Sequence, residues 1–219
     1  MTNRLAIFDC DGTLVDSQHN IVAAMDGAFI AAGLPPPTRA QTLSIVGLSL
    51  VPAIAALIPE GDETLHVEVA EGYKTHFQTM RRSAGPAEPL FEGIADILDR
   101  LETDGWLLGI ATGNSDRGLS HCLEAHGLLG RFVTVQTADR HPSKPHPSMI
   151  ELAMAEAGAA AGSTLMIGDT SFDMAMACAA GVRALGVGWG YHAPATLIEA
   201  GAESVAMDSA ELGRHIGLP

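Results

Sequence analysis

Two aspartates separated by one residue follow a short apolar run near the start of the chain. Leu5-Ala6-Ile7-Phe8 has the length and composition of a buried strand, and Asp9-Cys10-Asp11-Gly12-Thr13 comes directly after it. Ligands of open α/β sheets bind outside the carboxyl ends of the strands. Gly12 lets the chain turn, so both carboxylates can converge on one point. Because carboxylates that close together repel each other, the pattern predicts a shared proton or a hard divalent cation such as Mg²⁺.

A hydroxyl, a glycine and an amide follow a second apolar run, in the sequence Thr112-Gly113-Asn114 after Leu107–Ala111. A strand end that passes into a helix start offers a hydroxyl and backbone N–H groups to a phosphate. Lys144 lies further on, in Ser143-Lys144-Pro145-His146-Pro147, where the prolines restrict the direction of the chain. Each feature alone has a structural alternative, namely a helix cap and a solvated loop lysine. His141 and His146 flank Lys144, and contact with a leaving group is a secondary hypothesis for them.

A second acidic pair follows the apolar run Leu165–Gly168, with Asp169 at its end and Asp173 four residues later. Asp173 has an alternative reading as a first-turn helix residue favoured by the helix dipole. A carboxylate at the end of a buried strand, such as Asp169, needs a partner. Together the four sites supply a nucleophile, a general acid, metal ligands, a hydroxyl donor and a cation. These are the groups that phosphoryl transfer requires.

Strands and helices alternate in the second half of the chain, which is typical of a parallel sheet with helices on both faces. Strands are expected at 107–111, 132–136, 164–167 and 183–187, and helices at 93–104, 117–126, 147–157 and 172–180, before a weak αβα pattern over 195–216. We therefore predict an α/β fold with a doubly wound, mainly parallel Rossmann-like sheet, to which the first strand also belongs.

The segment between the first strand and this region contains no convincing strand pattern. Asp16-Ser17 is suited to begin a helix that ends near Gly33, and the stretch 38–82 also reads as helical. Breaks are expected at Gly47, Pro52 and Pro59-Glu60-Gly61.

The helical segment divides the chain into two parts. We predict a catalytic core over residues 1–15 and 89–219 and an inserted all-helical cap over 16–88, with a linker at Ser83–Pro89. An insertion directly after the catalytic strand end is placed to close over the site as a lid.

Two residues of the cap are expected to contact the substrate. Gly47 permits close approach of the backbone, and Ser49 begins a helix whose N–H groups can meet an anionic substrate. Lys74, Arg81 and Arg82 are weaker candidates, because charges on helix faces are usually solvated.

The composition narrows the possible partners. With 12 Lys and Arg against 26 Asp and Glu, the net charge is −14, which argues against nucleic acid, since phosphate backbones require clustered cations. No apolar stretch reaches membrane-spanning length, and the N-terminus lacks the long apolar region of a signal peptide. Three scattered cysteines form no disulfide framework, so we expect a reduced, cytoplasmic setting. We expect a monomer or a homodimer.

With these motifs in this order, the chain resembles the haloacid dehalogenase-like hydrolase superfamily, on its phosphatase branch, over essentially the whole length. The second half is most similar to phosphoglycolate phosphatase-like members. The segments that carry this likeness are Ala111-Thr112-Gly113-Asn114, Ser143-Lys144-Pro145-His146-Pro147, Gly168-Asp169-Thr170 and Gly188-Trp189-Gly190-Tyr191.

The resemblance implies a role for each acidic residue. Asp9 would be the nucleophile that forms an aspartyl-phosphate. Asp11 would act as general acid and then general base, and would bind Mg²⁺ through its backbone carbonyl. Asp169 would complete the protein ligands of Mg²⁺. Asp173 would support the metal site or orient Lys144.

The resemblance also implies how the phosphoryl group is held. Thr112, Gly113 and Asn114 would bind it, and Lys144 would neutralise the nucleophile and the phosphate. The dehalogenating branch is disfavoured because it lacks an acid at the position of Asp11. The phosphonate-cleaving branch is disfavoured because small residues would be expected there.

These expectations favour Mg²⁺-dependent hydrolysis of a small phosphorylated metabolite, with phosphoglycolate as the best single candidate. A sugar phosphomutase or a pyrophosphatase of the same superfamily is the alternative among enzymes. A phospho-accepting signalling domain uses similar groups, but it would carry its phosphorylated aspartate in mid-chain and lack the helical insertion. A catalytically idle interaction module would be expected to have lost one of the four motifs, and none is missing.

Overall fold

The computed structural model describes residues 2–82 and 88–218. One sheet has the strand order β3-β2-β1-β4-β5-β6, and all neighbouring strands are parallel. The strands are β1 (Asn3–Phe8), β2 (Trp106–Thr112), β3 (Phe132–Thr137), β4 (Ala159–Gly168), β5 (Arg183–Val187) and β6 (Ser204–Ala206). The predicted α/β fold is confirmed. The strand order reverses between β1 and β4, which is where open sheets of this kind bind ligands.

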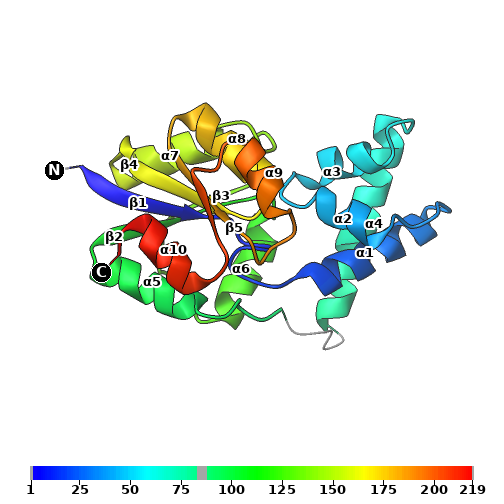
Figure 1. Cartoon of the computed structure of the whole chain (residues 1–219). Coiled ribbons are helices and arrows are strands. Elements are labelled where there is room, and N and C mark those ends of the chain that lie inside the picture. The colour runs from blue at the N-terminus through cyan, green and yellow to red at the C-terminus, as the bar shows by residue number, and fades with distance from the viewer. Residues whose placement is uncertain (1, 83–87, 219) are drawn as a thin grey trace.

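Helices cover both faces of the sheet (Figure 1). One face carries α5 (Ile94–Thr103), α6 (Asp116–Ala125) and α10 (Ser209–Ile216), and the other carries α7 (Ser148–Ala157), α8 (Ser171–Ala180) and α9 (Pro194–Glu199). Each face of the sheet has its own apolar core. Along β1, Ala6 and Phe8 belong to the core under α5, α6 and α10, whereas Leu5 and Ile7 belong to the core under α7, α8 and α9. Burial on both faces explains why this strand reads as an uninterrupted apolar run.

The strand β4 is longer than the sequence predicts. It begins at Ala159 rather than Thr164, and its pairing with β1 shifts between Asn3, opposite Ala159, and Leu5, opposite Thr164. The residues between are small and partly exposed, so they carry no apolar signal. The expected strand therefore covers only the buried half of β4.

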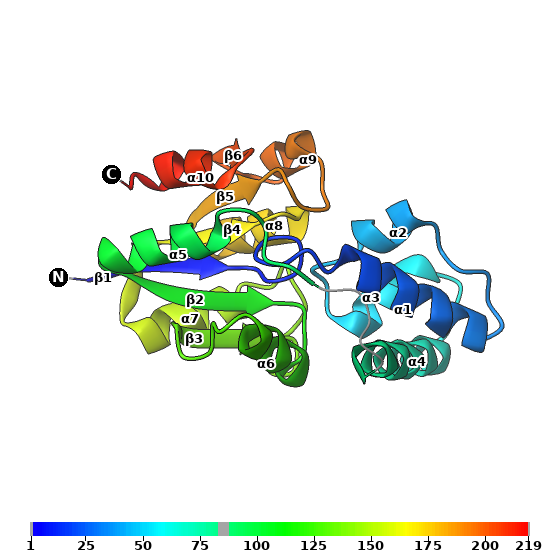
Figure 2. The same cartoon turned by 90° about the horizontal axis from the view of Figure 1, so that it is seen from below.

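Four helices lie beyond the carboxyl ends of the strands and form the cap (Figures 1 and 2). They are α1 (Gln18–Ala31), α2 (Arg39–Ser44), α3 (Leu50–Leu57) and α4 (Glu63–Arg82). They have an apolar core of their own, in which α1 packs against α4. The expected break at Pro52 is wrong, because Pro52 lies in the first turn of α3, where a helix tolerates proline.

Most of the linker expected at 83–89 falls on residues 83–87, outside the described part of the chain. The described residues between 18 and 82 contain helices and connecting turns but no strand. We therefore retain residues 16–88 as the proposed extent of the cap. None of the helices that the structure describes combines the length and the apolar character needed to cross a membrane.

Candidate active site

The predicted site residues meet at the edge of the sheet that faces the cap. Asp9 follows β1, Thr112 ends β2 and Asp169 follows β4, while Lys144 comes from the loop between β3 and α7. All four side chains are buried. Residues far apart in the sequence are thus brought to the point where the strand order reverses.

Lys144 bridges two of the carboxylates. Its Nζ atom lies 2.9 Å from Asp9 Oδ1 and donates a hydrogen bond to Asp173 Oδ1 at 2.6 Å. Burial by itself lowers the pKa of Lys144, but the charges and hydrogen bonds of Asp173 and Asp9 together raise it above its ordinary value. The other oxygen of Asp173 accepts hydrogen bonds from the backbone N–H and the hydroxyl of Thr170, in a capping box at the start of α8. Asp173 is therefore placed to orient Lys144.

Asp9, Asp169 and Asp173 form an acidic cluster, in which one oxygen of each lies within 4.8 Å of the others. Burial is the main cause that raises the pKa of Asp9 to about 7, despite the opposing charge of Lys144. Burial, followed by the charges of Asp9 and Asp173, also raises the pKa of Asp169. Apart from the ion pair with Lys144, neither oxygen of Asp9 has a hydrogen-bond partner among the described residues. A buried set of carboxylate oxygens with this much mutual repulsion fits Mg²⁺.

Neighbouring groups hold Asp169 from both sides. Thr13 Oγ1 donates to Asp169 Oδ1 at 2.9 Å, and the backbone N–H of Tyr191 donates to Oδ2 at 2.8 Å. Gly12 has φ +90°, and a Cβ atom there would lie 2.2 Å from Asp169 Oδ2. The turn after Asp11 therefore requires glycine both for its backbone conformation and for this close approach.

The side chain of Asp11 lies apart from the acidic cluster. Ser17 Oγ donates to Asp11 Oδ1 at 2.6 Å, and Asn114 Nδ2 donates to Oδ2 at 3.2 Å. The pKa of Asp11 is raised, mainly by burial. The hydrogen bond from Ser17 and the charge of Arg81 lower this pKa, whereas the charge of Glu88 raises it further. A carboxyl group with a raised pKa that shares a cavity with a second carboxyl group, that of Asp9, is suited to general acid catalysis.

The two residues that contact Asp11 differ in how they compare with the sequence-based expectations. Ser17 does begin α1, but its side chain makes no capping hydrogen bond, because its hydroxyl donates to Asp11 instead. Asn114 lines the cavity, and its predicted contact with the phosphoryl group stays a prediction. Its side-chain Nδ2 donates to Asp11, and its Oδ1 accepts from the backbone N–H of Ser115. Asn114 therefore positions the expected general acid.

A cavity of about 340 Å³ lies between the core and the cap. Asp9, Asp11, Thr112 and Gly113 line it from the core. Its cap side is formed mostly by apolar side chains, among them Ile21, Met25, Val51 and Phe77. The volume is at the lower end of the range of about 300–1,000 Å³ for small-molecule sites. The cavity therefore has room for a small metabolite that reaches Asp9.

The two predicted cap residues, Gly47 and Ser49, also line the cavity. Gly47 has φ +101°, and a Cβ atom there would lie 3.0 Å from Thr170 Oγ1, so the loop around it sits directly on the core. Ser49 precedes the first residue of α3, as expected, and its own backbone N–H donates to Ser143 Oγ at 2.9 Å. The hydroxyl oxygen of Ser49 is buried and has no hydrogen-bond partner in the described part of the chain. Substrate contact at these residues stays a prediction.

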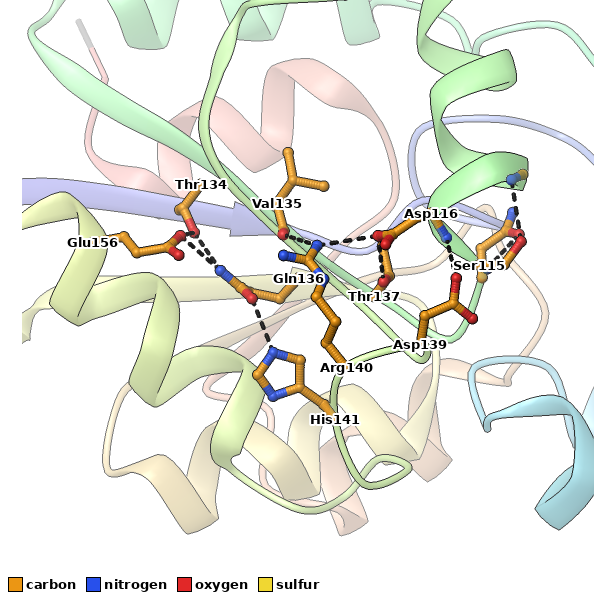
Figure 3. A network of polar contacts seen from close by, with 12 residues as sticks. Ser115, Asp116, Thr134, Val135, Gln136, Thr137, Asp139, Arg140, His141 and Glu156 are labelled. Carbon is orange, nitrogen blue, oxygen red and sulfur yellow. Dashed lines mark hydrogen bonds and ion pairs between the residues drawn. The ribbon is translucent and has the colours of Figure 1, made fainter.

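A polar network holds the base of the loop between β3 and α7 (Figure 3). His141 Nδ1 lies 3.0 Å from Ser148 Oγ, and His141 Nε2 lies 2.9 Å from Gln136 Oε1. Gln136 Nε2 also donates to Glu156 at 2.8 Å. Neither His141 nor His146 is among the described residues that line the cavity. The structure therefore gives His141 a role in shaping the loop and does not support the leaving-group hypothesis.

Two charged residues near the cavity could not be singled out from the sequence. Arg81 lines the cavity, and Glu88 lies close enough to influence the pKa of Asp11. The last turn of a helix is the usual place for a solvated cation, so no local signal indicated that Arg81 is partly buried at the cavity.

Known proteins are similar to this chain in sequence and in fold. A family model described as haloacid dehalogenase-like hydrolase matches residues 6–187. The chain is 39% identical over 194 residues to a probable phosphatase, IndB, of Dickeya dadantii, covering 86% of this chain and 82% of that protein. It is 31% identical over 194 residues to a phosphoglycolate phosphatase of Xanthomonas campestris pv. campestris, covering 86% and 85%. A crystal structure of a hydrolase from Pseudomonas syringae matches with a TM-score of 0.86 at 25% identity, covering 99% and 98%.

Proposed function

The chain belongs to the haloacid dehalogenase-like hydrolases, as a phosphatase of that family, and we propose that it hydrolyses a small phosphate monoester through an aspartyl-phosphate on Asp9. Phosphoglycolate is the best single substrate candidate, supported by relatives such as the Xanthomonas phosphoglycolate phosphatase. The observation that carries the proposal is the placement of two unlike carboxyl groups at one cavity. Asp9 forms an ion pair with Lys144. Asp11 lines the same cavity, but its carboxyl group accepts hydrogen bonds from Ser17 and Asn114.

In the proposed first step, an oxygen of Asp9 attacks phosphorus and the ester P–O bond breaks. Asp11 gives its proton to the departing alcohol oxygen. In the second step, Asp11 takes a proton from water as the water attacks phosphorus, and the bond between Asp9 and phosphorus breaks. Splitting the hydrolysis in this way lets one acid–base group serve both steps.

The remaining residues act on charge and position. Lys144 lowers the repulsion between the carboxylate of Asp9 and the incoming phosphate, and Thr112 with the N–H of Gly113 holds the phosphoryl oxygens. Mg²⁺ would be held by Asp9, Asp169 and the backbone carbonyl of Asp11, and would supply further neutralisation of phosphoryl charge. The cap, by closing over the cavity, keeps bulk water away from the reacting groups.

Removal of the metal is expected to lower kcat on 4-nitrophenyl phosphate at least about a hundredfold, because the acidic cluster then repels the phosphate. The measurement is phosphate release after treatment with EDTA and gel filtration, with Mg²⁺ or Ca²⁺ added back. Mg²⁺ should restore activity, whereas the larger Ca²⁺ should not. Mg²⁺ should also raise the melting temperature of the wild type but not of Asp169→Asn. Full activity in a preparation shown to be metal-free would contradict the proposal.

The alternative of a sugar phosphomutase or a pyrophosphatase uses the same groups, and the phosphatase relatives favour hydrolysis. Assaying phosphoglycolate, a hexose 1-phosphate and pyrophosphate side by side separates the three by their products. We further propose a cytoplasmic monomer or homodimer that acts on a small phosphorylated metabolite. The net charge of −14 supports the absence of nucleic acid and of anionic membrane surfaces among its partners.

A further inference from the structure

Arg81 differs from the other basic residues of the cap. Its side chain is 20% exposed, it lines the cavity, and its guanidinium carbon lies 4.5 Å from the centre of the Phe77 ring. Arg82, the next residue in the last turn of α4, is exposed. Lys74 also borders the cavity, but it is half exposed and forms an ion pair with Glu71 at 2.7 Å. The prediction that all three side chains are solvated on helix faces is therefore wrong for Arg81.

Among the described residues, Arg81 makes one long ion pair, and part of its guanidinium group has no hydrogen-bond partner. Its Nη2 atom pairs with Glu88 Oε2 at 3.4 Å, which is long for a hydrogen bond. Glu88 is shared, because its Oε1 accepts from Asn20 Nδ2 at 3.0 Å. The Nε atom of Arg81 is buried and has no hydrogen-bond partner among the described residues. A guanidinium offers five N–H donors in a fixed fork, so it can bind a second acceptor beside Glu88.

The surroundings indicate which acceptor this is. The cap side of the cavity is mainly apolar, so a carboxylate that enters it loses its hydration and needs a cation to offset that loss. The core end already holds Asp9 and Asp11, which repel a carboxylate and bind a phosphoryl group only with the help of Lys144 and a metal. A substrate with two anionic ends is therefore oriented, with its phosphate at the core and its carboxylate at Arg81.

We propose that Arg81 binds the carboxylate on the leaving group of such a substrate and is the residue that selects carboxylated phosphate esters over plain ones. This proposal rests on the proposed phosphatase function and adds to it the residue that selects the substrate. Two purely structural roles for Arg81 compete with it. The helix dipole would favour any cation in the last turn of α4, but it applies equally to the exposed Arg82. The ion pair with Glu88 ties α4 to the chain that returns to the core, and a structural tie of this kind predicts equal effects on all substrates.

The test compares kcat/KM for matched substrates with and without the carboxylate. The pairs are phosphoglycolate with ethyl phosphate, and 4-carboxyphenyl phosphate with phenyl phosphate. Arg81→Gln is expected to lower the ratio of carboxylated to plain substrate about 10- to 100-fold in at least one pair, mainly through KM, because a charged hydrogen bond is lost. Arg81→Lys should lose less, because it keeps the charge without the fork. Arg82→Gln is the matched control and should leave the ratio unchanged.

Glu88→Gln separates substrate binding from the structural tie. If Arg81 binds the substrate carboxylate, Glu88→Gln removes the carboxylate that competes with it. The ratio of kcat/KM for carboxylated over plain substrate then stays the same or rises, whereas Arg81→Gln lowers it. The same loss on both substrates of each pair, or the same result from both variants, would overturn the proposal. If Arg81→Gln fails to fold, the proposal is still tested by the kcat/KM ratio of Arg81→Lys. It is also tested by inhibition of the wild type, in which 4-(phosphonomethyl)benzoate should inhibit more strongly than benzylphosphonate. Equal inhibition by the two would also overturn it. Failure of the wild type to hydrolyse phenyl phosphate at all would instead refute the phosphatase function.

Discussion

Asp9→Asn is expected to lower kcat by several powers of ten on every phosphate monoester. Asn has the shape of Asp but cannot attack phosphorus effectively, and it removes an anionic ligand from the metal site. The measurement is phosphate release from 4-nitrophenyl phosphate at saturating Mg²⁺. Asp96→Asn makes the same chemical change at an exposed position of α5 and should retain full activity. Activity of Asp9→Asn above about one hundredth of the wild type would contradict the assignment of the nucleophile.

Loss of folding should not account for this result. Burial raises the pKa of Asp9 to about 7, which means that the ionised carboxylate is disfavoured in the folded state. Ionisation of Asp9 therefore lowers the stability of the metal-free protein as the pH rises above its ordinary pKa of 3.8, and this loss is complete above about pH 7. Asp9→Asn is neutral, so its melting temperature without metal at pH 8 should equal or exceed that of the wild type.

Asp11→Asn is expected to lower kcat on the order of 10²- to 10⁴-fold while leaving the metal bound. The side chain of Asp11 contacts Ser17 and Asn114 and takes no part in the acidic cluster of Asp9, Asp169 and Asp173. Its proton transfer is lost in the variant, but its backbone carbonyl is unchanged. Calorimetric titration with Mg²⁺ should therefore give an affinity close to that of the wild type. Loss of Mg²⁺ binding would show that the side chain is itself a ligand.

The residues at the strand ends could be predicted from the sequence because their signal is local. Each apolar run has the length of a buried strand, and the polar residue after it marks the end. Asp9 and Asp169 follow directly from this pattern, and the parallel sheet then brings them to one edge. The same reasoning predicts β5 at its observed limits, Arg183–Val187.

Features that depend on packing between distant segments could not be predicted. Ser17 has the local pattern of a helix cap, and only the fold shows that its hydroxyl donates to Asp11. Arg81 has the pattern of a solvated cation, but its side chain is only 20% exposed, and it lines the cavity beside Phe77 and Glu88. The first half of β4 has small residues with no periodic signal, so its pairing with Asn3 appears only in the sheet.

The central claim, a covalent phosphoryl group on Asp9, is tested most directly by chemical trapping. The enzyme is mixed with excess substrate and Mg²⁺, quenched rapidly in acid and reduced with borohydride, which converts an acyl phosphate of aspartate to homoserine. Peptide mapping by mass spectrometry then locates the modified residue. We predict homoserine at position 9 in the wild type, more of it in Asp11→Asn if the second step is slowed more than the first, and none without substrate. Substrate turnover with an unmodified Asp9, or homoserine at another aspartate, would contradict the proposed mechanism.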